Sequence, residues 1–199
     1  EMSASLVGSE MCIRDRNKLL WARLSTVYAT NASGNFFLPE PDDEVVVGFM
    51  NEDPGHPIIL GGVYGERHKP PYEYEAKNNT KAIVTREKMR IEFNEEKKMV
   101  KISTPGKNTV EISDDDKHIK LTDQNKNEIV MNSSGISFSS AKDITLKAKG
   151  AITMDATSKF SATAKQDVSL EGLNVNMQAK VSAAVKGNAK AELSASGQT

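Results

Sequence analysis

The sequence predicts an all-β protein that consists of a small barrel followed by a trimeric β-helical needle. The first observation is a series of short apolar runs separated by turn residues, a pattern that is typical of short strands. The second is a β phrase that recurs about every eight residues between Ile129 and Ala195. A repeat this short cannot bury an apolar face by itself, so we expect its copies to stack.

Residues 17–72 are predicted to form the barrel. Apolar residues alternate in its first strand, and β-branched runs mark two later strands as buried. Segments rich in Asn, Asp, Gly and Pro lie around these strands and are predicted to be turns. The predicted strands are residues 20–24, 44–49 and 57–64, and the predicted turns are residues 31–35 and 51–55.

A polar stretch, residues 73–88, is predicted to be a neck, and residues 89–199 are predicted to be the needle. At the start of the needle, pairs of apolar residues recur at steps of nine or ten, and each pair encloses one charged residue. If successive strands lie side by side, opposite charges face each other on the outer surface. The pairs are Ile91/Phe93, Val100/Ile102, Val110/Ile112 and Ile119/Leu121, and they enclose Glu92, Lys101, Glu111 and Lys120.

The recurring pattern, here called the octad, has five defined positions. The first and third are apolar, the second faces outward, the fourth is any residue and the fifth is small. Positions one and three fall on one face of a strand, and position two falls on the other. The small fifth residue permits a tight corner. The first positions are Ile129, Ile136, Ile144, Ile152, Phe160, Val168, Val175, Ala183 and Ala191, and the third are Met131, Phe138, Leu146, Met154, Ala162, Leu170, Met177, Val185 and Leu193. The predicted trimer core is Ile136, Phe138, Ile144, Leu146, Ile152, Met154, Phe160, Val168, Leu170, Val175 and Met177.

Three chains enclose this narrow apolar stripe more simply than one chain does. A helix is excluded because eight residues are not two helical turns, and strict alternation would scatter the apolar groups around its axis. A single chain could close only by stacking two or three octads per coil. Three chains around one axis would form a triangular prism without exposed strand edges. The octads therefore predict an intertwined homotrimer, a triple-stranded β-helix.

One block of the barrel resembles a known family. Residues 35–49 (NFFLPEPDDEVVVGF) and 51–61 (NEDPGHPIILG), with flanking matches at 21–25 and 69–71, are similar to the spike family of contractile injection machines. Its members include the valine-glycine repeat (VgrG) proteins of type VI secretion and the central spikes of contractile phage tails. The barrel block followed by short β repeats is more specific than either feature alone.

The resemblance implies an oligonucleotide/oligosaccharide-binding (OB) type barrel, a neck and a triple-stranded β-helix. It also implies partners: the tube protein, the baseplate hub, a PAAR-repeat tip protein, effectors and, transiently, the target-cell envelope. The implied location is the bacterial cytoplasm during assembly, followed by secretion or injection. A phage tail baseplate spike and a trimeric adhesin or fibre stalk are the alternatives.

The sequence departs from full-length members of this family in several ways. The hub domains and the first barrel strand are absent, and the octads still run at Thr199, so we expect a gene fragment. Residues 1–16 resemble the translation of a sequencing adapter and are predicted to be a non-native tail.

No residue cluster of the sequence indicates catalysis, and we predict a protein without enzymatic activity, cofactor or metal. Acidic residues 40 and 42–44 precede a buried strand and are predicted to be a solvated turn, as are residues 114–116. His56, His68 and His118 lack metal-ligand spacing with each other and with Cys12, and are predicted to be surface or turn residues. Phe36, Phe37 and Phe49 are predicted to fill the barrel core.

The composition argues against two classes of partner. A net charge of -1 gives no reason to expect nucleic acid. No run of about 18 apolar residues is present, as a membrane-spanning helix would require.

Overall fold

A computed structural model describes residues 2–3, 10–13, 18–192 and 194, with side chains from Trp21 onward. The chain divides into two units, Glu1–Ile144 and Thr145–Thr199. The described residues form β-strands, turns and one short 3-10 helix, η1 (Met50–Glu52), and they include no α-helix. None of the helical structure in the described ranges is long and apolar enough to cross a bilayer. The prediction of an all-β protein is confirmed.

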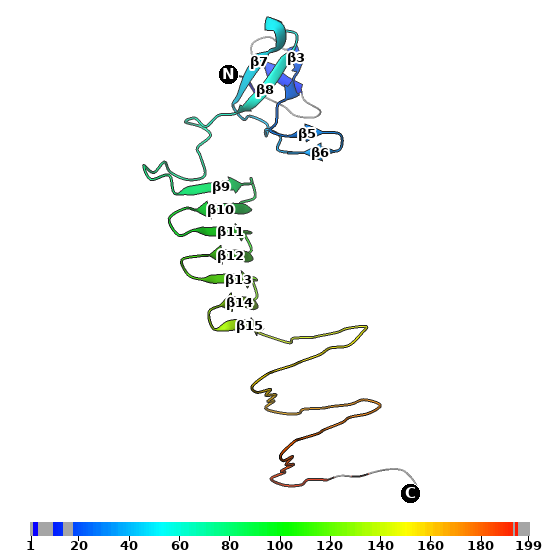
Figure 1. Ribbon diagram of the computed structural model, residues 1–199. Coiled ribbons are helices and arrows are strands. Elements are labelled where there is room, and N and C mark those ends of the chain that lie inside the picture. The colour runs from blue at the N-terminus through cyan, green and yellow to red at the C-terminus, as the bar shows by residue number, and fades with distance from the viewer. Residues whose placement is uncertain (1, 4–9, 14–17, 193, 195–199) are drawn as a thin grey trace. The chain divides into compact units, whose positions relative to one another are not determined.

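Small sheets make up the first part of the chain (Figure 1). One sheet has the order β1-β2-β3, and another has the order β4-β8-β7, in which β4 runs parallel to β8. Between β4 and β7 in the sequence, β5 and β6 form a separate hairpin. The strands are β1 (Met2–Ser3), β2 (Glu10–Ile13), β3 (Lys18–Trp21), β4 (Arg23–Leu24), β5 (Ala29–Thr30), β6 (Ser33–Gly34), β7 (Val45–Phe49) and β8 (Pro57–Gly62).

The core of these small sheets is formed by Ala22, Val45 and Ile59, with Leu24 and Val47 packed against it. The core residues come from the strand segments that the sequence predicts, because β7 and β8 coincide with the two β-branched runs. A small sheet with one buried face has room for few side chains, and β-branched residues fit it well.

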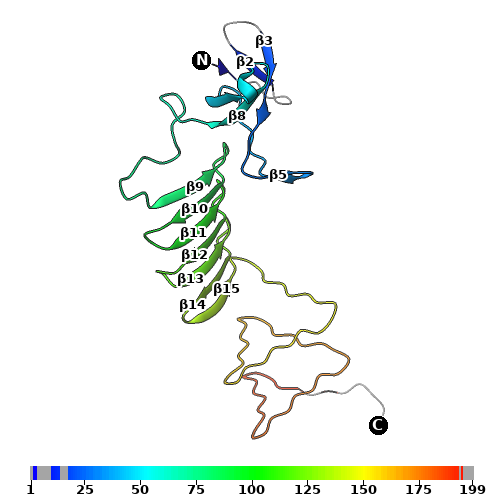
Figure 2. The same ribbon diagram turned by 45° about the horizontal axis from the view of Figure 1, so that its top comes forward.

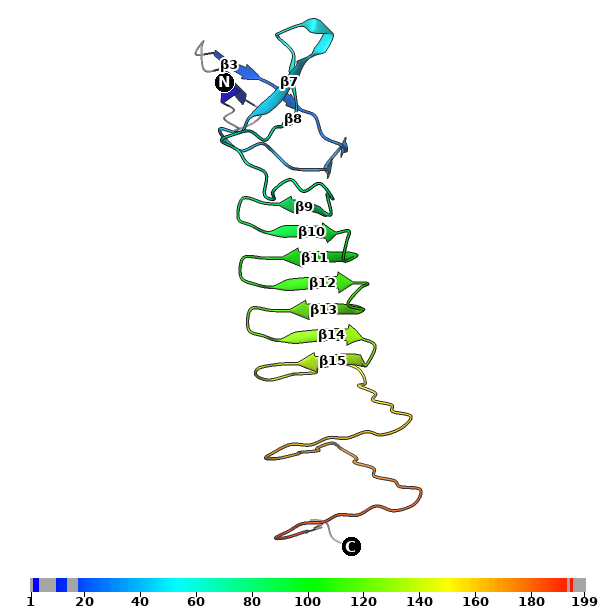
Figure 3. The ribbon, with the colours of Figure 1, turned by 90° about the vertical axis from the view of Figure 1, so that its left-hand side faces the viewer.

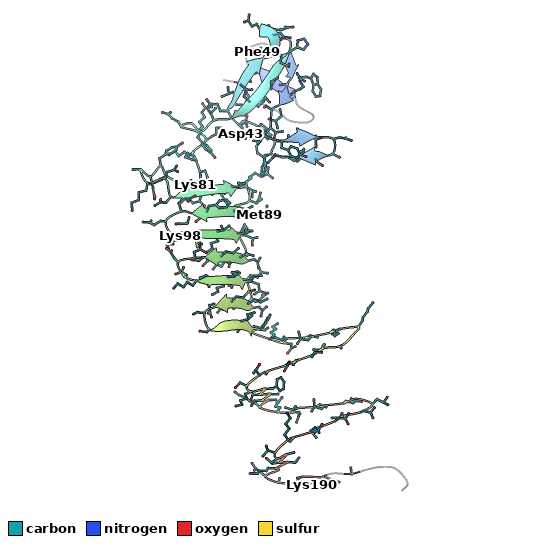
Figure 4. All side chains as sticks on the ribbon, in the orientation of Figure 1. Asp43, Phe49, Lys81, Met89, Lys98 and Lys190 are labelled. Atoms are coloured by element: carbon teal, nitrogen blue, oxygen red, sulfur yellow. The ribbon has the colours of Figure 1, made fainter. Side chains whose placement is uncertain are left out.

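The prediction that the phenylalanines fill this core is wrong. Phe36, Phe37 and Phe49 are 83%, 63% and 50% exposed (Figure 4 labels Phe49). Phe36 and Phe37 follow the β5–β6 hairpin in a segment outside the strands, and Phe49 is the last residue of β7. Their positions at the margin of the sheets keep them out of a core that lies between the strand centres.

Seven consecutive strands then form one antiparallel meander (Figure 3). Each strand pairs with the strand that precedes it and the strand that follows it. The first of them lies within the stretch predicted to be a neck. The strands are β9 (Thr80–Val84), β10 (Arg90–Asn94), β11 (Met99–Ser103), β12 (Thr109–Ser113), β13 (His118–Thr122), β14 (Glu128–Asn132) and β15 (Gly135–Ser139).

The turns of the meander alternate between its two edges, because successive strands are antiparallel. Residues 85–89, 104–108 and 123–127 form one edge, which we call the lysine edge. Residues 95–98, 114–117 and 133–134 form the other, which we call the aspartate edge. In Figure 4, Met89 and Lys98 mark the opposite edges of the sheet.

Three turns of the lysine edge share one design. The amide nitrogens of Lys88, Lys107 and Lys126 donate to the carbonyl oxygen three residues earlier, at 2.9, 3.0 and 3.1 Å. These lysines have φ values of 64°, 66° and 68°, the left-handed region that normally favours glycine. The turns recur every 19 residues, so one structural unit contains two strands and two turns.

The octads after β15 contain no strand in the described residues 140–192 (Figure 2). Residues 145–192, taken by themselves, are extended and make wide turns, and they have no ladder partner among the described residues. Backbone groups of an extended segment need a partner to form a sheet. Leu193 and Ala195, the last octad positions, lie outside the described residues, as do Thr199 and most of residues 1–16.

We expect Lys107→Val to destabilise the meander by about 1–2 kcal/mol, because a β-branched residue fits poorly at a positive φ. Lys107→Gly should keep the stability within about 0.5 kcal/mol of the wild type, since relief of strain is offset by a more flexible unfolded chain. The measurement is thermal unfolding, with Lys97→Val as the control at a turn position without positive φ. Equal stability of Lys107→Val and Lys97→Val would contradict this account.

Candidate functional site

One face of the meander carries two continuous apolar rows. The strand register places Phe93, Val100 and Ile112 side by side, and it continues this row to β15. A second row lies beside it on the same face. The first row is Phe93, Val100, Ile112, Ile119, Met131 and Ile136, and the second is Ile83, Ile91, Ile102, Val110, Leu121, Ile129 and Phe138.

The opposite face carries the charged row that the sequence predicts. Glu92 pairs with Lys101, Lys101 with Glu111, and Glu111 with Lys120 in the strand register. The Nζ atom of Lys101 lies 2.9 Å from Oε2 of Glu111, and that of Lys120 lies 2.8 Å from Oε1 of Glu128. The predicted alternation of opposite charges is confirmed.

The charged face is better covered than the apolar face. Glu92, Lys101, Glu111 and Lys120 are all half-buried, whereas most members of the two apolar rows are exposed, for example Ile102 and Ile112 at 46%. The long charged side chains lie across each other, and no described residue of Glu1–Ile144 packs over the apolar rows to bury them. This distribution is the reverse of a globular domain, in which apolar rows are covered first. The apolar face is therefore the candidate assembly surface of the chain.

A groove of about 540 Å³ borders this surface at the lysine edge. Its apolar wall is formed by the second row, from Ile102 to Phe138, and by Ile144. The side chain of Asn127 shapes this end of the sheet: its Oδ1 accepts from Oγ of Ser140 at 2.9 Å and from the amide nitrogen of Ala141 at 3.1 Å. These hydrogen bonds lead the chain away from the ladder directly after β15.

The predicted trimer core divides into residues that the structure brings together and residues that it does not. Ile136 and Phe138 lie on β15 and continue the apolar rows of the meander. The remaining members, from Ile144 to Met177, stand between 51% and 80% exposed on segments without strands. Their assignment to a trimer core stays a prediction.

Apolar residues on strands β9 to β14 belong to the same surface but were missing from the predicted core. The signal was present in the sequence, because the apolar pairs that enclose Glu92, Lys101 and Glu111 alternate just as the octads do.

The acidic residues near the barrel strands form a hydrogen-bonded turn. The amide nitrogen of Glu40 donates to Oδ2 of Asp43 at 2.8 Å, and the amide nitrogen of Asp43 donates back to the carbonyl oxygen of Glu40. The carboxylate of Glu40 pairs with Arg86 at 2.8 Å, and Asp43 lies 3.9 Å from His68. His56 pairs with Asp53 in the next turn at 2.9 Å.

His118 is not a surface or turn residue, contrary to the prediction. It begins β13, its side chain is 19% exposed, and its Nε2 lies 3.0 Å from Oε1 of Glu111. Potential ligand atoms of Glu111, Asp116 and His118 lie within 4.8 Å of one another. The ammonium group of Lys101 already occupies the second oxygen of Glu111. This geometry describes an ion-pair network that fixes the charged face.

Comparison with known proteins relates two segments of the chain to the same class, the injector and baseplate proteins of contractile systems. Residues 7–64 match the family of the type VI secretion system/phage-baseplate injector OB domain. Residues 99–180 match the phage baseplate V C-terminal trimerisation domain. The first match begins within the segment predicted to be a non-native tail, and that assignment stays a prediction.

Several relatives are spike proteins of type VI secretion systems. The spike protein VgrG1c of Pseudomonas aeruginosa is 37% identical over 62 residues, which are 31% of this chain and 8% of that protein. VgrG1a of the same species is 33% identical over 72 residues, 36% of this chain and 11% of that protein. The actin cross-linking toxin VgrG1 of Vibrio cholerae is 37% identical over 67 residues, 34% of this chain and 6% of the toxin.

Residues 7–64 belong to the injector OB-domain family and residues 99–180 to the baseplate trimerisation-domain family. Together with these relatives, the two matches support a VgrG-like spike protein of a contractile injection system. The matched segments span about a tenth or less of the length of these three relatives.

We expect Glu111→Gln to reduce the dependence of stability on acid. The Lys101 ammonium and the His118 hydrogen bond hold the pKa of Glu111 below its ordinary value of 4.5 against the opposing effect of burial. A lowered carboxyl pKa contributes stability above the pKa of the unfolded chain, and this contribution is lost as the pH falls through the folded pKa.

The wild type should therefore lose stability between about pH 5 and pH 3 more steeply than Glu111→Gln. At neutral pH the variant should be less stable by about 1 kcal/mol. Melting temperatures across this pH range check the expectation, with Glu96→Gln as a control in the exposed pair with Lys77. Parallel curves for Glu111→Gln and the wild type would be the contrary result.

Proposed function

We propose that this chain is one of three identical copies that build the spike of a contractile injection apparatus, either a type VI secretion system or a related phage tail. The observation that supports it most is the apolar face of the β9–β15 meander, which is more exposed than the charged face behind it. Burial of such rows is the dominant favourable term in assembly.

Three copies would bury the apolar face of the meander more completely than two copies would. Three narrow sheets that face one axis enclose a triangular interior, and their edges meet at the corners of the prism. Two face-to-face sheets would leave the apolar interior open to water along both of their turn edges, where exposure of apolar surface is unfavourable. The octads after β15 also call for other copies, because their extended segments have no strand partner among the described residues. The predicted columns from Ile136 to Met177 would then continue the interior of the spike.

The function of this assembly is mechanical in our proposal. Backbone hydrogen bonds along each sheet and a dry apolar interior would spread an axial load over many contacts. The expected partners are the tube protein and the baseplate hub, a PAAR-repeat tip protein and effectors, and the target-cell envelope during puncture. The spike would assemble in the bacterial cytoplasm and leave with the injected tube. Neither catalysis nor nucleic-acid binding forms part of the proposal.

A phage baseplate spike is the nearest alternative, and a trimeric adhesin or fibre stalk is the more distant one. The match to the injector OB domain favours an injection apparatus, since a stalk has no need of that domain. The neighbouring genes discriminate between the systems: sheath and tube genes of type VI secretion support one, and tail genes of a phage support the other.

Sedimentation equilibrium of the full chain tests the proposed assembly. We expect a folded particle of three times the chain mass of 21.7 kDa. A folded monomer, with a cooperative thermal transition and no dependence on concentration, would refute the trimeric spike.

Replacement of Ile152 by Asp should abolish trimer formation. Ile152 is the first position of an octad, so the substitution would place three carboxylates around one axis, where unpaired charges are strongly disfavoured. Thr153→Asp is the matched control, because its position points outward in the predicted prism. Sedimentation and melting of both variants supply the measurement. An Ile152→Asp trimer that melts like Thr153→Asp would contradict the interior assignment.

A further inference from the structure

Three lysines stand at equivalent positions along the lysine edge. Lys88, Lys107 and Lys126 each occupy the fourth position of a stacked turn, with φ values that differ by only a few degrees. Their side chains therefore leave the turns in the same direction, about 9.6 Å apart, which is two strand spacings. Within the described part of the chain, these ammonium groups form no ion pair or hydrogen bond. Lysine also stands at positive φ on the aspartate edge, at Lys98 (45°) and Lys117 (52°), so the backbone does not distinguish the two edges. The excess of positive charge along the lysine edge is what points to a use for these side chains.

The aspartate edge carries a net negative charge in its central turn, residues 114–117, where three aspartates outnumber Lys117. The turn at residues 95–98 holds two glutamates and two lysines. The central turn holds three successive carboxylates, Asp114, Asp115 and Asp116, and only the last accepts a side-chain hydrogen bond, from Oγ of Ser113 at 3.2 Å. Asp114 and Asp115 have no side-chain partner among the described residues. In the turn above, Glu95 and Glu96 are partly neutralised by Lys81 and Lys77. The strongest unneutralised negative charge of this edge thus lies at residues 114–115.

Both edges are hollowed on the side of the apolar rows. The groove at the lysine edge includes Asn108 and Asn127 from the turns that carry Lys107 and Lys126. A second hollow of about 500 Å³ lies at the aspartate edge, between Asp114 and Lys117 of the turn and Ile119 of the first row. An aliphatic lysine stem could lie against such an apolar wall and bring its ammonium group to the carboxylates.

We propose that, in the assembled spike, the lysine edge of one copy docks against the aspartate edge of the next. The occupant of each edge is a second copy of this chain, and the inference rests on the proposed trimer. Turns of the two edges alternate along the sheet, one strand apart. Lys107 and Lys126 of one copy therefore flank Asp114 and Asp115 of its neighbour when the sheets stand level. At each of the three corners of the prism, the lysine edge of one copy then meets the aspartate edge of the next copy around the ring.

This arrangement makes a specific statement about symmetry. Contact between unlike edges is heterologous, so it closes into a ring of copies and does not form a two-fold dimer. A dimer formed through like edges would bring lysines against lysines and aspartates against aspartates, which is repulsive. The charges therefore select the cyclic assembly over the pairwise one, and the apolar rows supply most of the adhesion.

Charge reversal in the full-length chain tests the proposal. The first variant is K107E/K126E and the second is D114K/D115K, each of which makes the two edges alike. The third variant combines all four substitutions and restores complementarity with the signs exchanged. K107Q/K126Q serves as the neutral control, because it keeps the turn positions and removes the charge without reversing it.

We expect each reversal to lower the melting temperature of the trimer by at least about 5 °C at low salt, since six ion pairs become repulsive. Salt of about 1 M should reduce this loss, because the Debye length falls to about 3 Å. The fourfold variant should regain most of the wild-type melting temperature. The neutral control should fall between the wild type and the reversals.

Mixing gives a second measurement, which holds even if each reversal alone folds poorly. When K107E/K126E and D114K/D115K chains are refolded together, a mixed ring has two attractive corners and one repulsive corner. Native mass spectrometry should therefore show mixed trimers in excess over either pure trimer. Statistical mixing would contradict the edge contact.

The outcomes separate this inference from the proposed function. A wild-type trimer whose reversals melt unchanged, or whose fourfold variant fails to recover, overturns the edge contact and leaves the trimeric spike standing. A wild-type chain that is not trimeric overturns the proposed assembly and the edge contact together.

Discussion

The structure depends on one constraint: the described part of the chain leaves two apolar rows on the β9–β15 meander largely uncovered. The polar side chains of the opposite face find partners within the same sheet, because Glu111 pairs with both Lys101 and His118 across the strands. This asymmetry defines which face of the sheet is inner and which is outer. A slip of one residue in strand register would exchange the faces, so the ion pairs and the apolar rows specify the same register.

Much of the meander could be predicted from the sequence, because the residue pattern that marks its strands and turns lies within a few neighbouring residues. The apolar pair around each charged residue predicts both the strand and its orientation, and the turn at residues 114–117 follows from three successive aspartates. Strand β9 was missed because its short, mixed sequence carries no clear alternation; its pairing with β10 creates the strand. Pairing between distant segments is a tertiary effect that a local pattern does not contain.

The exposed phenylalanines and the octads show a different limit. An apolar side chain such as Phe36 is expected to be buried, but the sequence pattern does not show whether its own chain or a partner molecule covers it. The same holds for Ile152, whose pattern predicts a strand although no strand forms in one chain. The lysines at positive φ were also hidden, since Lys107 replaces the glycine that normally marks such a turn. In each case the deciding partner or conformation lies outside the local sequence pattern.

The departure of the chain from the sheet at Ser140 has a consequence for the order of folding. The meander is built from neighbours in sequence, so its contact order is low and its strand ladder can form rapidly within one chain. In the proposed trimer, cover for its apolar rows comes from the other copies. The octads have no such route, because no described segment of their own chain supplies a ladder partner. In the proposed trimer the partners come from other molecules, so octad folding should be second-order at the start and then proceed along the chain. The meander would thereby act as the template that aligns three chains before the octads wind together.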